Sequence, residues 1–394
     1  MTMSLFAVIV AALADAGPEP AVPAPTHAHA HGAPGGAVAT TAIAPDGTVW
    51  VARTEEGYVL VNASRDLGRT FSPPVRVNPE PEKIDANGEA RPKVALGPEG
   101  EVFVSYTRRL DKPYTGEVVF SRSTDGGKTF SPPVRVMDAA LASGRFDLLA
   151  VAPKGEVHVF FIGRGETKEA ALYHVVSTDR GRTFGASVNV KSNVCECCRL
   201  AVAWDGETPI VFWRDMVAGG VRDHCVARLD SDAKEPTVAR ATDDGWEIAA
   251  CPHHGPALAI GTGGVQHFAW FTGEGRRGKG AFYRRSTDGG TTFSAPVRLG
   301  GDDAGHPDVL ARGTVVWAAW KEPRAGDTTV VAAMRSDDAG VTWSKPAEIA
   351  RTPKGSDHPL LVAHGDEAFL SWMTQDEGLR LLPLAPVNAV TTRR

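Results

Sequence analysis

The stretch Ser123-Thr124-Asp125-Gly126-Gly127-Lys128-Thr129-Phe130 occurs along the chain in five closely similar copies. The other four copies begin at Ser64, Ser177, Ser286 and Ser336. Each keeps Asp at the third position, Gly at the fifth, Thr at the seventh and Phe or Trp at the eighth. Sequence similarity that returns about every 50 residues is typical of propellers and other repeat arrays.

The residue types of this repeat suit a tight turn followed by an anchor in the core. The Asp carboxylate and the Ser and Thr hydroxyls can hydrogen-bond to nearby backbone groups and so fix a turn. The glycine at the fifth position, such as Gly127, suggests a positive φ, which glycine adopts most easily. The closing aromatic side chain would return the chain into the core. We therefore interpret the repeat as structural and assign no catalytic role to its aspartates.

Between the copies, short β-branched and aromatic runs are bounded by Gly, Pro and Asp, which is the spacing of an all-β protein. The strands predicted for one repeat are Pro92–Leu96, Val102–Tyr106, Glu117–Arg122 and Pro133–Val136. About two repeat lengths separate Ser177 from Ser286, and a degenerate copy, Leu229-Asp-Ser-Asp232, lies between them.

After the last copy, further strands are predicted at His358–Ala363, Ala368–Met373, Leu379–Leu384 and, more weakly, Val387–Thr392. The sequence thus predicts an all-β propeller of four-stranded blades, with seven blades favoured and six as the alternative.

The N-terminal region differs from the repeats. The apolar segment Leu5–Ala14 is too short to span a bilayer and runs into Ala14-Asp15-Ala16, a small-residue site that suits signal peptidase. We expect residues 1–16 to be a signal peptide, residues 17–36 a flexible Pro-, Ala- and His-rich tail, and residues 37–394 one propeller domain. The protein is accordingly expected to be exported, periplasmic or secreted, without a transmembrane anchor. Its net charge of −5 offers no basic field for nucleic acid.

The tail carries a short histidine run of its own. His27, His29 and His31 alternate with alanine, a pattern that can gather Zn²⁺ or Cu²⁺ loosely. The alternative is a solvated tail without a specific function.

The five cysteines fall in the long interval between two repeats, around the predicted fourth blade. Because the repeated turn joins the third and fourth strands of a blade, the opposite face gathers the blade-to-blade crossings and the loops between second and third strands. The cysteines and two neighbouring histidines map to that face: Cys195, Cys197, Cys198, Cys225, Cys251, His253 and His254.

Three interpretations of this cluster stay open. Cysteines of an exported protein usually form disulfides, and two bridges would leave one thiol over. Thiolates with imidazole also suit a soft metal ion, copper or zinc, and the Cys-x-Cys-Cys spacing puts several sulfurs within reach of one ion. The third interpretation is a redox-active thiol.

Charged residues form a second candidate site on the same face. The expected starts of the innermost strands, at the mouth of the central channel, carry Arg91, Arg145, Asp147, Arg199, His306, Asp308, Asp357 and His358. The loop of the fourth blade adds Arg214, Asp215, Arg222 and Asp223. Arginine binds carboxylate or phosphate through two parallel hydrogen bonds, so a small anionic ligand is one expectation. The alternative is that these groups pair with one another between blades.

The repeat resembles the Asp box, or BNR repeat, of the sialidase-type propellers, which lies between the third and fourth strands and away from the active site. That resemblance implies an exo-sialidase, in which three arginines hold the sugar carboxylate and a tyrosine is the nucleophile. This chain departs from the pattern, because Ala90-Arg91-Pro92 lacks the usual aromatic and isoleucine, and no tyrosine follows Tyr283.

The run Cys195-Glu-Cys-Cys-Arg199 is similar to a subgroup of bacterial sialidase-like proteins. The leading hypothesis is an exported propeller that binds a soft metal or a small anion. A glycoside hydrolase and a non-enzymatic scaffold for a protein partner are the alternatives.

Overall fold

The computed structural model describes residues 38–165, 169–231 and 235–384. The expected signal peptide, the tail with His27, His29 and His31, and the weak strand Val387–Thr392 lie outside the described residues, as does Asp232 of the degenerate repeat. The helical elements described are two 3₁₀ turns, η1 (Ala218–Gly220) and η2 (Thr262–Gly264). Within the described ranges, no helix is both long and apolar enough to cross a membrane.

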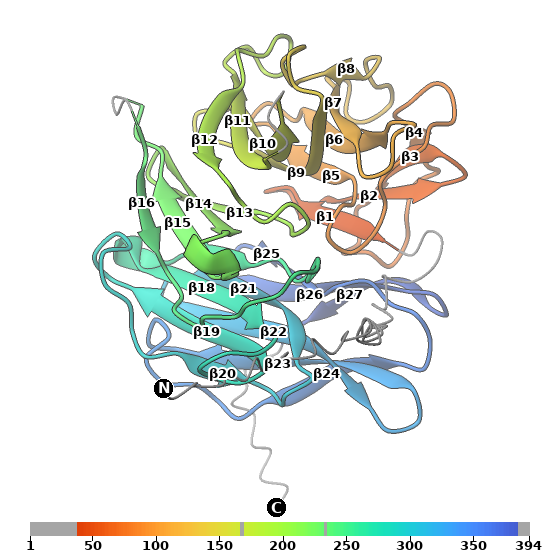
Figure 1. Cartoon of the computed structure of the whole chain (residues 1–394). Helices are drawn as coiled ribbons and strands as arrows, with labels where there is room; N and C mark the ends of the chain where they lie inside the picture. Colours follow the sequence, from red (N-terminus) through yellow and green to blue (C-terminus); the bar gives the residue numbers. More distant parts are fainter. Residues whose placement is uncertain (1–37, 166–168, 232–234, 385–394) are drawn as a thin grey trace, which may run out of the picture. The chain divides into compact units, whose positions relative to one another are not determined.

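The described residues form seven antiparallel sheets, each built from strands that are consecutive in the chain (Figure 1). The first two sheets are β1 (Ala39–Ile43), β2 (Val49–Glu55), β3 (Tyr58–Ser64), β4 (Val75–Arg76), and β5 (Lys93–Leu96), β6 (Val102–Arg109), β7 (Gly116–Ser123), β8 (Val134–Arg135). The next two are β9 (Ser143–Val151), β10 (Val157–Arg164), β11 (Ala171–Ser177), β12 (Val188–Ser192), and β13 (Ala201–Asp205), β14 (Thr208–Arg214), β15 (His224–Arg228), β16 (Thr237–Arg240).

The chain continues with β17 (Ala257–Ile260), β18 (Gln266–Thr272), β19 (Gly280–Ser286), β20 (Val297–Leu299), and β21 (Gly305–Arg312), β22 (Val315–Arg324), β23 (Thr328–Ser336), β24 (Ala347–Thr352). The seventh sheet has three described strands, β25 (Leu360–His364), β26 (Glu367–Thr374) and β27 (Gly378–Pro383). The prediction of a seven-bladed, all-β propeller is confirmed.

Seven apolar clusters hold the described blades together, each between two successive blades. The cluster between the third and fourth blades includes Phe160 and Trp213, and the one between the fourth and fifth includes Phe212 and Trp270. The last cluster packs β1 and β2 of the first blade against β26 and β27 of the seventh and so closes the ring. Since every blade buries both faces, second strands such as β18 are buried along their whole length.

All five copies of the repeat form the same hydrogen-bonded turn between the third and fourth strands of their blades, as predicted. In the second blade, the Ser123 hydroxyl donates to Asp125 Oδ1 (2.7 Å) and accepts the Gly127 N–H (2.9 Å). The Thr129 hydroxyl donates to Asp125 Oδ2 (2.6 Å). Hydrogen bonds from Thr129 and Ser123 lower the pKa of Asp125, because they stabilise its ionised carboxylate within the turn.

The glycine at the fifth position of the repeat also lets neighbouring blades pack closely. A Cβ on Gly127 would lie inside van der Waals contact of the Trp50 indole in the preceding blade, and one on Gly181 would meet the Phe120 ring at 2.5 Å. In the first blade, Gly68 faces Leu381 of the seventh blade. The repeat therefore fixes blade-to-blade packing in addition to the local turn.

We expect Gly127→Ala to lower the free energy of unfolding by about 2–4 kcal/mol, because left-handed strain and the overlap with Trp50 add together. The neighbouring Gly126 is a matched control, since its φ is also positive but an added methyl group would have no atom within 4 Å. Gly126→Ala should therefore cost only about 1 kcal/mol. Urea unfolding of both variants measures the difference; equal losses would contradict the packing role.

Candidate functional site

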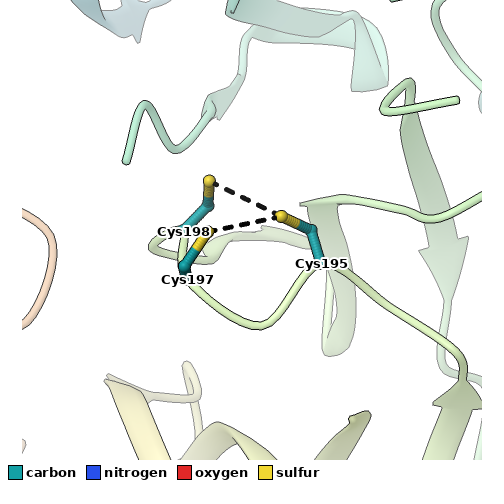
Figure 2. A group of neighbouring side chains, drawn as sticks. All are labelled: Cys195, Cys197 and Cys198. Carbon is teal, nitrogen blue, oxygen red and sulfur yellow. Dashed lines mark hydrogen bonds between the residues drawn. The ribbon is translucent and has the colours of Figure 1, made fainter. Parts of the chain in front are cut away.

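Three buried cysteines lie together on the crossing between β12 and β13 (Figure 2). Cys195 begins the group, and its N–H donates to the carbonyl of Arg214 at the end of β14 (3.1 Å). Its Sγ lies 3.6 Å from Cys197 Sγ and 4.0 Å from Cys198 Sγ. We call Cys195, Cys197 and Cys198 the thiol cluster.

The spacing of the sulfurs in the thiol cluster separates a shared ion from a disulfide. A disulfide has an S–S length of about 2.05 Å, and all five cysteines of the chain are free thiols in the structure. Two thiolates that bind one Zn²⁺ at about 2.3 Å and a tetrahedral angle lie about 3.8 Å apart. The observed 3.6 and 4.0 Å match that value.

The other two cysteines lie differently. Cys251, on the crossing between β16 and β17, packs against the apolar cluster that contains the thiol cluster. Cys225, at the start of β15, belongs to the same apolar cluster, but its thiol donates to Asp215 Oδ2 (3.4 Å). Sequence reasoning grouped all five cysteines; the structure packs all five around one apolar cluster and brings the sulfurs of three within 4.8 Å of one another.

The two predicted histidine ligands, His253 and His254, follow Cys251 on the same loop. His254 stacks between Phe271 and His306, with ring centroids 4.0 Å from each. Its Nδ1 contacts the Pro252 carbonyl at 2.6 Å. His253 lies on the same loop in a left-handed conformation, with φ of 51°.

Hydrogen bonds among the thiols decide where a negative charge is held. Those from Cys197 and Cys198 keep the pKa of Cys195 well below its ordinary value, assisted by Arg214 and against the effect of burial. Hydrogen bonding to Cys195 raises the pKa of Cys197, and burial raises that of Cys198 to about 12. A hydrogen bond from Cys197 lowers the pKa of Cys251 to about 7. Without a metal, the cluster therefore holds a thiolate at Cys195 beside two protonated thiols.

Arg214 is buried next to the thiol cluster and connects the loops that build it. Its Nη1 donates to the Arg222 carbonyl (3.0 Å), and its Nη2 donates to the carbonyls of His254 (2.8 Å) and Phe271 (2.7 Å). The guanidinium lies 5.1 Å from the centre of the Trp246 ring. Arg214 thus positions the loops and supplies positive charge near the sulfurs.

The other charged residues predicted on the loop of the fourth blade have internal partners. Asp215 accepts from the Trp213 indole (3.2 Å) as well as from Cys225. Asp223 pairs with Arg240 and accepts the Gly245 N–H (3.1 Å). The Arg222 Nε donates to the Ile248 carbonyl (3.4 Å).

The arginines and aspartates predicted at the channel mouth lie at the innermost strands and are also paired. Arg91 forms a buried ion pair with Asp357 (2.5 Å), and Arg145 forms one with Asp85 (2.6 Å). Asp147 accepts hydrogen bonds from the hydroxyls of Ser105 (2.6 Å) and Thr107 (2.9 Å). This arrangement corresponds to the inter-blade pairing that the sequence left open as the alternative.

Arg199 lies at the central cavity, and part of its guanidinium lacks a hydrogen bond. Its Nη2 donates to the Pro307 carbonyl (2.7 Å), while its buried Nη1 has no hydrogen-bond partner among the described residues. With Lys93, it lines a cavity of about 230 Å³ to which all seven innermost strands contribute. Burial lowers the pKa of Lys93 to about 8.

Glu89 is a site residue that sequence reasoning missed. Its Oε2 accepts the N–H groups of Arg199 (2.8 Å) and Gly255 (2.7 Å), and its Oε1 faces His306 and His358. Burial opposes ionisation, but contacts with these histidines and the charge of Arg199 hold the pKa of Glu89 well below its ordinary value. Its position two residues before Arg91 was the only signal in the sequence, and no motif marks it.

Solved structures similar to this chain share its fold. An ulvan lyase from a polysaccharide lyase family, bound to -[GlcA(1-4)Rha3S]-, is 12% identical; 90% of this chain and 93% of that chain align, with a TM-score of 0.57. A Hadza microbial sialidase is 14% identical, with 86% and 74% of the two chains aligned and a TM-score of 0.51.

The intramolecular trans-sialidase from Ruminococcus gnavus is 13% identical, with 74% of this chain and 93% of that chain aligned and a TM-score of 0.50. No family model matches the chain, and no curated protein matches it. At these identities the likeness concerns the fold, and the chain is similar to carbohydrate-active propellers in architecture.

Proposed function

We propose that this protein is a propeller that binds one soft metal ion, Cu(I) or Zn²⁺, through the thiol cluster. Cys195, Cys197 and Cys198 would be the sulfur ligands, and Cys251, packed against the same apolar cluster, is the candidate for a fourth. The observation that carries the proposal is the spacing of 3.6 and 4.0 Å between buried, unbridged sulfurs. Thiolate ligands select soft and borderline ions such as these.

The surroundings of the thiol cluster also suit a bound ion. Metal binding deprotonates cysteine, and buried thiolates need positive charge nearby. Arg214 and Arg222 supply that charge and already favour a thiolate at Cys195. The expected export would place the thiols in an oxidising compartment, where a bound ion would protect them from disulfide formation.

A small anion in the central cavity is a second candidate, favoured by the positive charges of Arg199 and Lys93, although the Arg199 Nη1, which has no hydrogen-bond partner among the described residues, lies 3.8 Å from Glu89 Oε1. The ulvan lyase and the sialidases among the similar structures act on or bind acidic carbohydrate, which is the alternative that the repeat implies. However, no tyrosine is among the described residues that line the cavity. The hydrolase proposal therefore lacks its nucleophile there, and we rank it below metal binding.

Native mass spectrometry of the exported wild-type protein tests the metal proposal. After purification without chelators, we expect a mass shift of at least one metal ion per chain, less the protons that the ion displaces from the thiols. Elemental analysis then identifies the metal. A metal-free chain in which Cys195, Cys197 and Cys198 are joined in disulfides would overturn the proposal.

A further inference from the structure

Glu89, His306 and His358 form a second cluster of potential ligands, separate from the thiol cluster. We call these three residues the Glu89 cluster. The His358 Nδ1 lies 3.2 Å from Glu89 Oε1, and the His306 Nδ1 lies 3.6 Å from the same oxygen. Glu89 and His358 are more than nine-tenths buried, and the His306 side chain is 18% exposed.

The three facing atoms of the Glu89 cluster have no hydrogen-bond partner among the described residues. They are Glu89 Oε1, His306 Nδ1 and His358 Nδ1, and all three are shielded from solvent. The other carboxylate oxygen is held by two backbone N–H groups, which aims Oε1 at the histidines. The three atoms contact one another without hydrogen-bond geometry, and a bound ion at their meeting point would satisfy all three.

We propose that the Glu89 cluster is a second metal site, which binds a divalent transition ion through one carboxylate oxygen and two imidazoles. Two such donors that bind one ion at about 2.1 Å lie about 3.0–3.4 Å apart at angles between octahedral and tetrahedral. The observed 3.2 Å between His358 Nδ1 and Glu89 Oε1 lies within this span, and the 3.6 Å between His306 Nδ1 and the same oxygen exceeds it by 0.2 Å. Two histidines with one carboxylate are a donor set used for divalent Fe and Zn.

The backbone around the cluster leaves room for the two rings. A Cβ on Gly88 would overlap the His358 imidazole, so only glycine fits beside that ring. His306 lies at a bulge in β21 with φ of 49°, a conformation that costs a non-glycine residue energy and recurs at functional sites. The rings of His306 and His358 are stacked, with centroids 3.4 Å apart. Binding of an ion would therefore require one ring to rotate, so that a nitrogen lone pair of each imidazole points at the ion.

Arg199 links the two sites, because it follows Cys198 in the chain and its N–H bonds Glu89. The thiol cluster offers sulfur and the Glu89 cluster offers nitrogen and oxygen, so the two sites would prefer ions of different softness.

Zn²⁺ binding to four forms of the full chain tests the second site independently of the first. Equilibrium dialysis should give about two ions for wild type, one for Glu89→Gln, one for Cys197→Ser and none for the double variant. Glu89→Gln keeps an oxygen for the two backbone N–H groups but places an amide NH₂ opposite the histidines. The Zn²⁺ affinity of the second site should fall at least about 100-fold in this variant.

His364→Ala is the matched control, because His364 lies at the surface away from both clusters and should leave the stoichiometry at two. His306→Ala provides a second variant if Glu89→Gln fails to fold by circular dichroism. Zn²⁺ should also shift the imidazole NMR signals of two histidines in the Cys197→Ser chain. If Glu89→Gln or His306→Ala binds as many ions as wild type, the second site is excluded. If Cys197→Ser binds as many ions as wild type while Glu89→Gln binds fewer, the thiol site is excluded and the second site is supported.

Discussion

Replacing Cys198 by Ser is expected to weaken Cu(I) or Zn²⁺ binding at the thiol cluster by about 100- to 1000-fold. Structural zinc sites bind with about 10–16 kcal/mol over four ligands, or about 3–4 kcal/mol for each, and about 1.4 kcal/mol is a tenfold change. Cys198 is buried with its Sγ 4.0 Å from that of Cys195, and a serine oxygen is a poor ligand for a soft ion. Competition with a chromogenic chelator measures the affinity.

Cys225→Ser is the matched control for this variant. Cys225 is also buried in the same apolar cluster, but its thiol bonds Asp215 rather than the other sulfurs. We expect its affinity to stay within about threefold of wild type, because Ser can keep the hydrogen bond to Asp215. Equal losses in the two variants would mean that the effect comes from disturbed packing and would contradict the ligand assignment.

The pH dependence of metal binding follows from the thiol pKa values. The lowered pKa of Cys195 favours its thiolate, whereas the raised pKa values of Cys197 and Cys198 favour protonated thiols until an ion displaces their protons. Affinity should therefore rise with pH, with about two protons released for each ion bound near pH 7. In Cys198→Ser the release should fall to about one proton.

The second large effect concerns the closure of the ring of blades. Arg91→Ala is expected to lower the free energy of unfolding by about 3–5 kcal/mol, because it leaves the Asp357 carboxylate buried without its partner. The pair is 2.5 Å long, and the two side chains are 3% and 1% exposed. Asp357 of the seventh blade also accepts the N–H of Ala39 in the first blade (3.1 Å), so the pair connects three blades. Urea unfolding measures the loss.

Arg351→Ala is the control for this prediction, because Arg351 forms an exposed ion pair with Glu348. This substitution should lower the free energy of unfolding by no more than about 1 kcal/mol. Changing both Arg91 and Asp357 to apolar residues should recover most of the loss, because no unpaired charge remains. A loss in Arg91→Ala no larger than that in Arg351→Ala would show that the buried pair does not hold the ring closed.

The fold could be predicted because its signals are local. Each repeated turn is fixed by hydrogen bonds within eight residues, so its sequence identifies a third-to-fourth strand connection wherever it occurs. The five copies of the turn, the degenerate copy and the strands predicted after the last copy together gave seven blades, and the position of the turn gave the face on which the crossings lie. The predicted strand Glu117–Arg122 matches β7 to within one residue at each end.

The candidate sites were only partly predictable because they depend on side-chain direction and distant partners. Cys225 lies on the expected loop, but its thiol points to Asp215, which strand position alone does not reveal. Arg91 was expected to contact a ligand, yet its partner Asp357 comes from the seventh blade. Glu89 becomes recognisable only when the crossings that carry His306 and His358 are brought beside it.

X-ray absorption at the metal edge of the loaded Glu89→Gln protein, which keeps the thiol cluster and loses the second site, is the most direct test of the thiol site. The spacing of Cys195, Cys197 and Cys198 predicts three or four sulfur neighbours at about 2.3 Å from the ion. A first shell made only of nitrogen and oxygen would contradict the assignment of these cysteines as ligands.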